Sequence, residues 1–213
     1  MDDAVLAALA RWPDVPACHG WLALDRRGRW RMRDEACQRA GLPGDPVTSP
    51  ALRGFIDRNY ACDEHGAWFF QNGPQRVYVT LEAAPFIVFA QPDAAEAAAP
   101  ALVTHNRLRV DRLDRAAFDD AGNLWLLTEH GPAIASDRDL AVFIDHLADA
   151  DGGPPDPDTL PERCLSTPTG LILRLPACPA GLPVEVLRSE ELSARLGFVR
   201  DPAIAGTGKT RMG

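Results

Sequence analysis

The sequence predicts an α+β protein built from two related units, each with a β-hairpin or small antiparallel sheet and a helix. The first observation is a repeated turn in which an Asp stands three residues before a Gly, with a Trp two or three residues after that Gly. It occurs in LDRRGRWRM (24–32), ACDEHGAWFF (61–70) and FDDAGNLWLL (118–127). Asp accepts backbone hydrogen bonds across a turn and Gly supplies positive φ, so we expect three turns that each lead into a strand.

The second observation is a repeated helical segment. SPALRGFID (49–57) aligns without gaps with DRDLAVFID (137–145). The order turn, strand, helix is therefore used twice, about 90 residues apart, which indicates internal duplication of a small α+β unit. Chance similarity between two short amphipathic segments is the alternative. We divide the chain into an N-terminal helix (1–13), a first unit (14–98), a second unit (100–200) and a flexible C-terminal tail (201–213), with QPDAAEAAAP (91–100) as the seam.

The N-terminal helix and the first unit together contain two predicted helices and a predicted hairpin. Asp2–Trp12 carries one apolar stripe and ends at Pro13. The segment 49–57 has Ser49 at the N-cap and Pro50 at the first helical position. In AWFFQNGPQRVYVTLE, Asn72-Gly73 favours a tight hairpin turn, and the following Pro predicts a loop longer than two residues. Alternation along its second strand places one polar set on a single face: Arg76, Tyr78, Thr80 and Glu82.

The second unit is predicted from shorter signals. APFIVFA (84–90) indicates a buried strand, and LVTHNRLRV (102–110), TGLILRL (169–175) and LPVEVL (182–187) indicate further strands. Asp137 is the predicted N-cap of the helix over 137–145, and Ser189 that of a short helix over 189–197. DGGPPDPD (151–158) is predicted to be a connector without helix or central strand.

Composition excludes several classes of protein. The chain is 46% hydrophobic and 24% charged, typical of a globular protein, and its net charge of −8 disfavours binding to nucleic acid or to anionic membranes. Five cysteines at wide spacing, without a CxxC pair, argue against a disulfide framework. The chain begins MDDAVLAALARW, without a basic leader, and no apolar run approaches about 18 residues, so we expect a cytoplasmic protein.

Motifs for cofactors and catalysis are weak. AIAGTGKT (203–210) fits the loose P-loop template, but only three residues follow it in this sequence, too few for the helix that such a loop needs. Cys62 and His65 have CxxH spacing, but a structural zinc site needs four ligands. There is no GxSxG elbow. We therefore expect no cofactor, no metal and no assignable catalytic residue.

The polar face of the central hairpin is the candidate binding site. An arginine there can clamp a carboxylate or phosphate, and neighbouring amides can add hydrogen bonds. The alternative is a solvent-exposed sheet face, or an internal ion pair that fixes the hairpin. The candidate ligand-binding residues are Arg58, Asn59, Asn72, Gln75, Arg76, Tyr78 and Glu82.

The same segment carries a family resemblance. WFFQNGPQRVYVTLE, with RNYACDEHG before it and APF after it, resembles a proteobacterial family of unknown function. More distantly, the D-x-x-G-x-W turn, strand and Ala-Pro-Phe pattern resembles an uncharacterised bacterial family with repeated α/β motifs that has been suggested to act in signal transduction. The resemblance implies repeated hairpin-plus-helix units and a binding or regulatory role, and it assigns no catalytic residue.

These observations lead to one functional hypothesis with two alternatives. We expect a cytoplasmic, non-enzymatic binding or regulatory module that recognises a small anionic ligand or an extended peptide along residues 58–82. The first alternative is a small hydrolase or transferase with unidentified catalytic residues. The second is a homodimeric structural protein whose exposed sheet edges form the interface.

Overall fold

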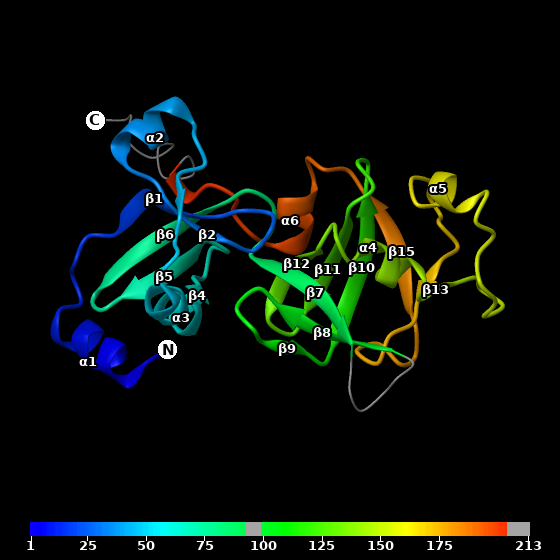
Figure 1. Ribbon diagram of the computed structural model, residues 1–213, viewed down its shortest axis with the longest axis horizontal. Helices are drawn as coiled ribbons and strands as arrows, with labels where there is room; N and C mark the ends of the chain where they lie inside the picture. Colours follow the sequence, from blue (N-terminus) through cyan, green and yellow to red (C-terminus); the bar gives the residue numbers. More distant parts are fainter. Residues whose placement is uncertain (93–98, 204–213) are drawn as a thin grey trace. The chain divides into compact units, whose positions relative to one another are not determined.

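The structure is a computed structural model that describes residues 1–92 and 99–203 (Figure 1). Most of the predicted seam at 91–100 and most of the predicted tail at 201–213 lie outside the described residues. All but the first residue of the P-loop-like segment 203–210 lie outside them as well.

The first sheet has six strands in the order β3-β2-β1-β6-β5-β4. Every neighbouring pair is antiparallel except the central pair, β1 and β6, which is parallel. The strands are β1 (Cys18–Leu24), β2 (Trp30–Met32), β3 (Asp45–Pro46), β4 (Tyr60–Cys62), β5 (Trp68–Asn72) and β6 (Gln75–Leu81).

The second sheet has nine strands in the order β13-β14-β15-β10-β11-β12-β7-β8-β9. Parallel pairing occurs between β10 and β15 and between β12 and β7. The strands are β7 (Phe86–Pro92), β8 (Pro100–Thr104), β9 (Arg109–Val110), β10 (Leu113–Asp119), β11 (Leu124–Thr128), β12 (Gly131–Ala135), β13 (Leu147–Ala148), β14 (Ile172–Leu173) and β15 (Leu182–Leu187).

Six strands of the second sheet repeat the topology of the first. The run β12-β11-β10-β15-β14-β13 corresponds strand for strand to β3-β2-β1-β6-β5-β4, with the parallel pair in the same central place. In both sheets a helix lies between the third and fourth of these strands in chain order. The predicted α+β class with two related units is therefore confirmed. The sequence predicted strand at β7 (as 84–90) and at β8 and β9 (as one strand over 102–110), but it did not predict the parallel pairs.

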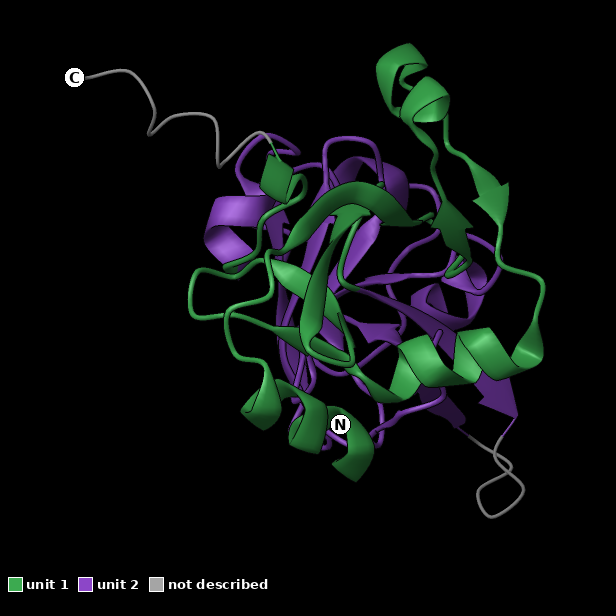
Figure 2. Ribbon diagram, turned by 90° about the vertical axis from the view of Figure 1, so that its left-hand side faces the viewer, with its two compact units in different colours: residues 1–85, 197–213 green, residues 86–196 purple. Residues whose placement is uncertain are grey.

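The chain forms two compact units, Met1–Pro85 with Gly197–Gly213 (unit 1) and Phe86–Leu196 (unit 2), coloured separately in Figure 2. These limits differ from the predicted ranges 14–98 and 100–200. The segment β7 belongs to unit 2 because it pairs with β8 and β12. The chain after residue 196 returns to unit 1, where Val199 bridges Ala67 and the Leu81 amide donates to the Arg200 carbonyl.

The predicted Asp turns are confirmed at all three positions. Asp25, Asp63 and Asp119 each accept hydrogen bonds from the backbone amides two and four residues later, at 2.8–3.0 Å. The Gly three residues after each Asp has positive φ, as in Gly122 at 78°. Thr104 builds a related turn through its hydroxyl, which accepts from the Leu108 amide. That turn interrupts the single strand predicted over 102–110.

Six helices occur in the described part of the chain: α1 (Asp3–Arg11), α2 (Glu35–Ala40), α3 (Pro50–Arg58), α4 (Leu140–Ile144), α5 (Leu160–Arg163) and α6 (Leu192–Leu196). The predicted Ser49 cap is confirmed, because its hydroxyl accepts from the Leu52 amide. Helix α3 packs on one face of the first sheet, where Asp57 accepts from the Trp30 indole at 2.7 Å and Phe55 meets Phe70 edge to face. No helix among the described residues is both long and apolar enough to cross a membrane.

Four local predictions are wrong, two in the hairpin loop and helix α4 and two near the end of unit 2. The β5–β6 loop has only two residues, Gly73 and Pro74, because Asn72 pairs with Gln75 and Gly73 takes a positive φ of 58°. Helix α4 has Asp139, not Asp137, at its N-cap.

The helix predicted over 189–197 begins only at Leu192. Ser189 does not cap it, because its hydroxyl hydrogen-bonds the Asp120 carboxylate. The strand predicted over 169–175 is reduced to Ile172–Leu173.

We predict that Asp119→Ala lowers the free energy of unfolding by about 2–4 kcal/mol. The Asp119 side chain is buried and accepts from the Ala121 and Asn123 amides and from the Trp125 indole at 2.8 Å, so the substitution removes one acceptor from three donors of the turn and the strand. Urea unfolding followed by tryptophan fluorescence measures the change. Asp114→Ala, which removes an exposed ion pair with Arg112, is the control and should shift stability by less than about 0.5 kcal/mol. Equal losses in the two variants would contradict the structural role of the buried carboxylate.

Candidate functional site

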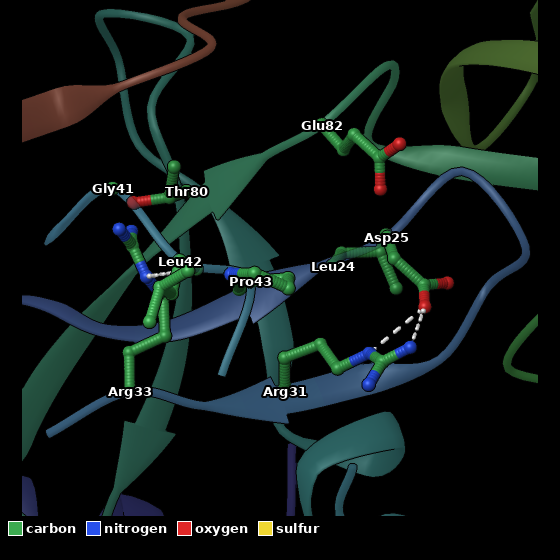
Figure 3. Close-up of a pocket in the computed structure, with 10 residues that line it drawn as sticks. Leu24, Asp25, Arg31, Arg33, Gly41, Leu42, Pro43, Thr80 and Glu82 are labelled. Atoms are coloured by element: carbon green, nitrogen blue, oxygen red, sulfur yellow. Dashed lines mark hydrogen bonds and ion pairs between the residues drawn. The ribbon is translucent and has the colours of Figure 1, made fainter. Parts of the chain in front are cut away.

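A cavity of about 250 Å³ lies in unit 1 beside strands β2, β1 and β6 (Figure 3). Its charged and polar lining residues are Asp25, Arg31, Arg33, Thr80 and Glu82. Its other lining residues are Ala23, Leu24, Gly41, Leu42 and Pro43. The cavity therefore combines charged groups with an apolar wall, the usual composition of a site for a small organic ligand.

Strand alternation and register place the cavity's side chains. Arg31 and Thr80 are both in register with Ala23, from opposite sides of β1, so the three share one face of the sheet. Arg33 follows Arg31 by two residues and Glu82 follows Thr80 by two, which keeps both on that face. Helix α3 packs on the opposite face, through Trp30 and Phe70.

The loop after helix α2 forms one wall of the cavity. Asp34 caps α2 by accepting from the Cys37 amide, and Gly41 ends it with a left-handed φ of 64°. The loop continues through Leu42 and Pro43 to Gly44, where a Cβ atom would collide with the Met32 carbonyl, so only glycine allows this close approach. Helix α2 is not among the predicted elements, although Asp34 and Gly41 are typical start and stop signals of a helix.

Arg31 of β2 and Arg33, the residue that follows β2, hold this loop, and they differ in how many of their donor groups have protein acceptors. Arg31 donates through Nε to the Asp25 carboxylate, brings Nη2 within 2.9 Å of the same oxygen, and reaches the Gly44 carbonyl through Nη1. Arg33 donates through Nε to the Leu42 carbonyl at 3.1 Å. In residues 1–92 and 99–203, no protein group accepts from the two Nη groups of Arg33. Arg31 is therefore structural, and Arg33 can bind a ligand.

The Asp25 carboxylate is a negative charge in the cavity wall that lies beside Arg31. Burial alone would raise its pKa, but hydrogen bonds from the Arg29 amide, the Arg31 and Arg29 side chains and the Arg27 amide outweigh burial, and the pKa lies below its ordinary value of 3.8. Asp25 is therefore ionised at neutral pH and compensates the charge of Arg31. The charge of Arg33 has no such partner among the described residues.

A sequence signal for this site was present but not used. Residues 26–33, RRGRWRMR, contain five arginines and no acidic residue, in a chain whose net charge is −8. Alternation along β2 puts Arg31 and Arg33 on one face and Trp30 on the other. A cluster of positive charge on an acidic protein favours binding of an anion, a signal that the prediction of a turn and strand for this segment does not contain.

The structure does not gather the seven predicted ligand-binding residues into one site. Only Glu82 lines the cavity described above. Arg58 and Asn59 instead bind the N-terminal segment through Asp2: Arg58 forms an ion pair with its carboxylate, and Asn59 accepts from its amide at 2.8 Å and donates to its carboxylate. Asn59 is fully buried and also donates to the Phe55 carbonyl, so it serves folding.

Asn72 and Gln75 border a second cavity, of about 260 Å³, that Ile56 of α3 also lines. They point to the face opposite Arg76, Tyr78, Thr80 and Glu82, because successive side chains of a strand alternate. The Gln75 amide donates to the Pro16 carbonyl. The predicted single binding surface is therefore divided between two faces of the sheet.

Arg76 and Tyr78 lie on the same face as Glu82 but outside the first cavity, and both have protein partners. The Arg76 guanidinium lies 4.6 Å from the centre of the Phe69 ring. The Tyr78 ring stacks on His19, and its hydroxyl donates to Asp63 at 2.9 Å. Burial and this hydrogen bond raise the pKa of Tyr78. Arg76 and Tyr78 therefore contact neighbouring side chains of unit 1.

The remaining motif residues do not form a cluster suited to metal binding. Cys62 is exposed and its thiol points to the Asp63 carbonyl, whereas the His65 ring faces Glu64. Within the described ranges, no three His, Cys, Asp or Glu side chains are grouped to hold a metal ion. All five cysteines are free thiols.

The fold and the site define a two-unit α+β protein whose unit 1 contains a cavity lined by charged groups of both signs and by apolar side chains. Residues 1–203 match the family DUF2944, described as "Protein of unknown function (DUF2946)", and the chain belongs to this family. The predicted membership of a family of unknown function is thereby confirmed. No curated protein is significantly similar to the chain.

Two solved structures are similar to part of the chain. One is a DUF1285 family protein from Shewanella baltica OS155, with 14% identity over 58% of this chain and 90% of that chain and a TM-score of 0.42. The other is a DUF1285 family protein from Silicibacter pomeroyi DSS-3, with 16% identity over 71% of this chain and 88% of that chain and a TM-score of 0.45.

We predict that Asn59→Ala loosens the N-terminal helix. The change removes the acceptor for the Asp2 amide and leaves a buried site without its hydrogen bonds, at a cost of about 1–3 kcal/mol. Hydrogen exchange measured by mass spectrometry should become faster in residues 3–11. Arg58→Gln removes only the exposed ion pair with the same Asp2 and should leave exchange there nearly unchanged. Unchanged exchange in Asn59→Ala would show that this residue does not hold α1.

We predict that Asp25→Asn makes stability less dependent on pH at the acidic end. A carboxyl whose folded-state pKa lies below 3.8 stabilises the fold above that pH, and the contribution is lost as pH falls through the folded-state pKa. Between about pH 5 and about pH 2.5, the urea midpoint of the wild type should therefore fall further than that of the variant. Asp14→Asn, at an exposed position, should follow the wild type. If the urea midpoint falls equally with pH in the wild type and in Asp25→Asn, the lowered pKa of Asp25 is contradicted.

Proposed function

We propose that the protein is a non-catalytic binding module whose unit 1 cavity holds a small organic anion through its carboxylate. The observation that supports this most directly is the state of Arg33. Its Nε is held by the Leu42 carbonyl, while no described protein group accepts from its two Nη groups. A guanidinium held in this way presents paired donors that match the two oxygens of a carboxylate.

The groups around Arg33 are already arranged to allow an anion to bind. Arg31 and Asp25 neutralise each other and fix the strand and turn, so they neither compete with Arg33 for the ligand nor repel it strongly. Thr80 lines the cavity and offers a hydroxyl as a further donor. Because the loop over 41–44 is bonded to both arginines, little ordering is needed when a ligand binds.

The apolar wall selects an organic anion over an inorganic one. Ala23, Leu24, Leu42 and Pro43 line the cavity and would cover the hydrocarbon part of a ligand. Inorganic phosphate has no apolar part and leaves these side chains in contact with water, whereas a carboxylate with a short carbon chain covers them. We place this binding in the cytoplasm, which the five free thiols support.

We predict that the full-length protein binds butyrate, with amide shifts in two-dimensional nitrogen-15 spectra at residues 23–33, 41–43 and 80–82. Arg33→Gln should weaken binding at least about fivefold, since it removes a charge-assisted contact at a partly hydrated site. Arg76→Gln, at an arginine on the same face but outside the cavity, is the matched control and should bind as the wild type does.

Two outcomes would contradict the proposed function. One is equal butyrate affinity in wild type and Arg33→Gln. The other is a set of shifts that maps elsewhere in the chain. Inorganic phosphate is included for comparison, and binding of phosphate as tight as that of butyrate would show that the apolar wall does not contribute.

A further inference from the structure

We infer that the ligand of this cavity also carries an ammonium group at the end opposite its carboxylate, as a short linear peptide with free termini does. The inference rests on the proposed function and adds a second recognition group, Glu82. Glu82 lies just after β6 and lines the same cavity as Arg33. Figure 3 shows the two side chains on opposite sides of the cavity.

The Glu82 carboxylate retains capacity to bind a cation. Its Oε2 accepts from the Arg26 amide at 3.1 Å, which orients the group. Within residues 1–92 and 99–203 the carboxylate makes no ion pair within 4.0 Å. A carboxylate accepts up to about four hydrogen bonds, so most of its capacity is open to a ligand ammonium group.

The register of the sheet separates the two charged groups. The Arg33 amide donates to the Trp21 carbonyl, and the Glu82 amide donates to the Leu24 carbonyl. The register places Arg33 opposite Trp21 and Glu82 opposite Asp25, so the two residues are about 13 Å apart along β1 and about 10 Å apart across it, on the strands to either side. Their long side chains shorten this distance within the cavity. The ligand must nevertheless place its opposite charges several bonds apart.

This separation distinguishes classes of ligand. A free α-amino acid carries its ammonium and carboxylate groups on one carbon and cannot reach both side chains. An extended chain spans about 3.3–3.6 Å per residue, so a tripeptide reaches about 10 Å. A dicarboxylate would place its second charge beside Glu82 and be repelled. The apolar residues Leu24, Leu42 and Pro43 line the cavity along with the two charged groups and can contact the middle of a peptide.

The test uses the full-length protein and three probes: triglycine, N-acetyltriglycine and triglycine amide. Nitrogen-15 shift titrations should show that triglycine binds, with shifts at residues 23–33, 41–43 and 80–82. Removal of the ligand's ammonium charge by acetylation should weaken binding about tenfold, the size expected for loss of a charge-assisted contact.

Glu82→Gln should weaken the binding of triglycine by the same factor and leave the binding of N-acetyltriglycine unchanged. The variant keeps an acceptor for the Arg26 amide, so the turn should stay in place. Glu64→Gln, at an exposed carboxylate in a different turn of unit 1, should bind all three probes as the wild type does.

The outcomes separate this inference from the proposed function. If N-acetyltriglycine binds as tightly as triglycine, or if triglycine fails to bind while butyrate binds, the ammonium site is overturned and the carboxylate site stands. The carboxylate site itself is overturned if triglycine amide binds as tightly as triglycine and Arg33→Gln leaves the affinity for both probes unchanged. Circular dichroism spectra that match the wild type confirm that each variant is folded.

Discussion

The structure depends on the aspartate carboxylates of the turns that follow β1, β4 and β10, whose hydrogen bonds must all be formed. Asp25 and Asp119 are almost fully buried, and each receives two backbone amides together with side-chain donors. An ionised group in such a place is tolerated only when it is paired, so the donors around it cannot be exchanged freely. The turn therefore fixes which strand residues stand beside it, and through them the face of the sheet on which each side chain lies.

The two units satisfy this requirement with different residues. Arg31 is in register with Ala23 and donates to Asp25 in unit 1, while Trp125 is in register with Ala117 and donates to Asp119 in unit 2. An indole offers one donor and a large apolar surface, and Trp125 is buried. A guanidinium offers five donors, so Arg31 both binds the turn and holds the loop at Gly44. This difference keeps the face polar in unit 1, where the cavity lies.

Much of the fold could be predicted from the sequence, because turn chemistry and capping act over a few residues. The three Asp turns, helix α3 with its Ser49 cap and the strand over 182–187 are confirmed. The parallel pairing of β1 with β6 depends on partners more than 50 residues apart, which no local pattern reports. For the same reason the site was predicted only in part. Asn59 has the polar side chain of a ligand-binding residue, but its partner is Asp2, and only the folded chain brings the two together.

The cavity follows from the spacing of the arginines along β2. Arg31 and Arg33 share a face, yet only Arg31 lies beside the turn carboxylate, because Asp25 follows β1 directly and β2 runs antiparallel to it. Arg33 is two residues farther from the turn, where the nearest acceptor is the Leu42 carbonyl of the loop that Arg31 helps to hold. Arg31 thus completes the scaffold, whereas Arg33 has a fixed side chain whose two Nη groups have no acceptor in the described part of the chain. The same separation places Glu82 beside the turn and Arg33 at the far end, so opposite charges at the two ends of the cavity are a consequence of the hairpin's register.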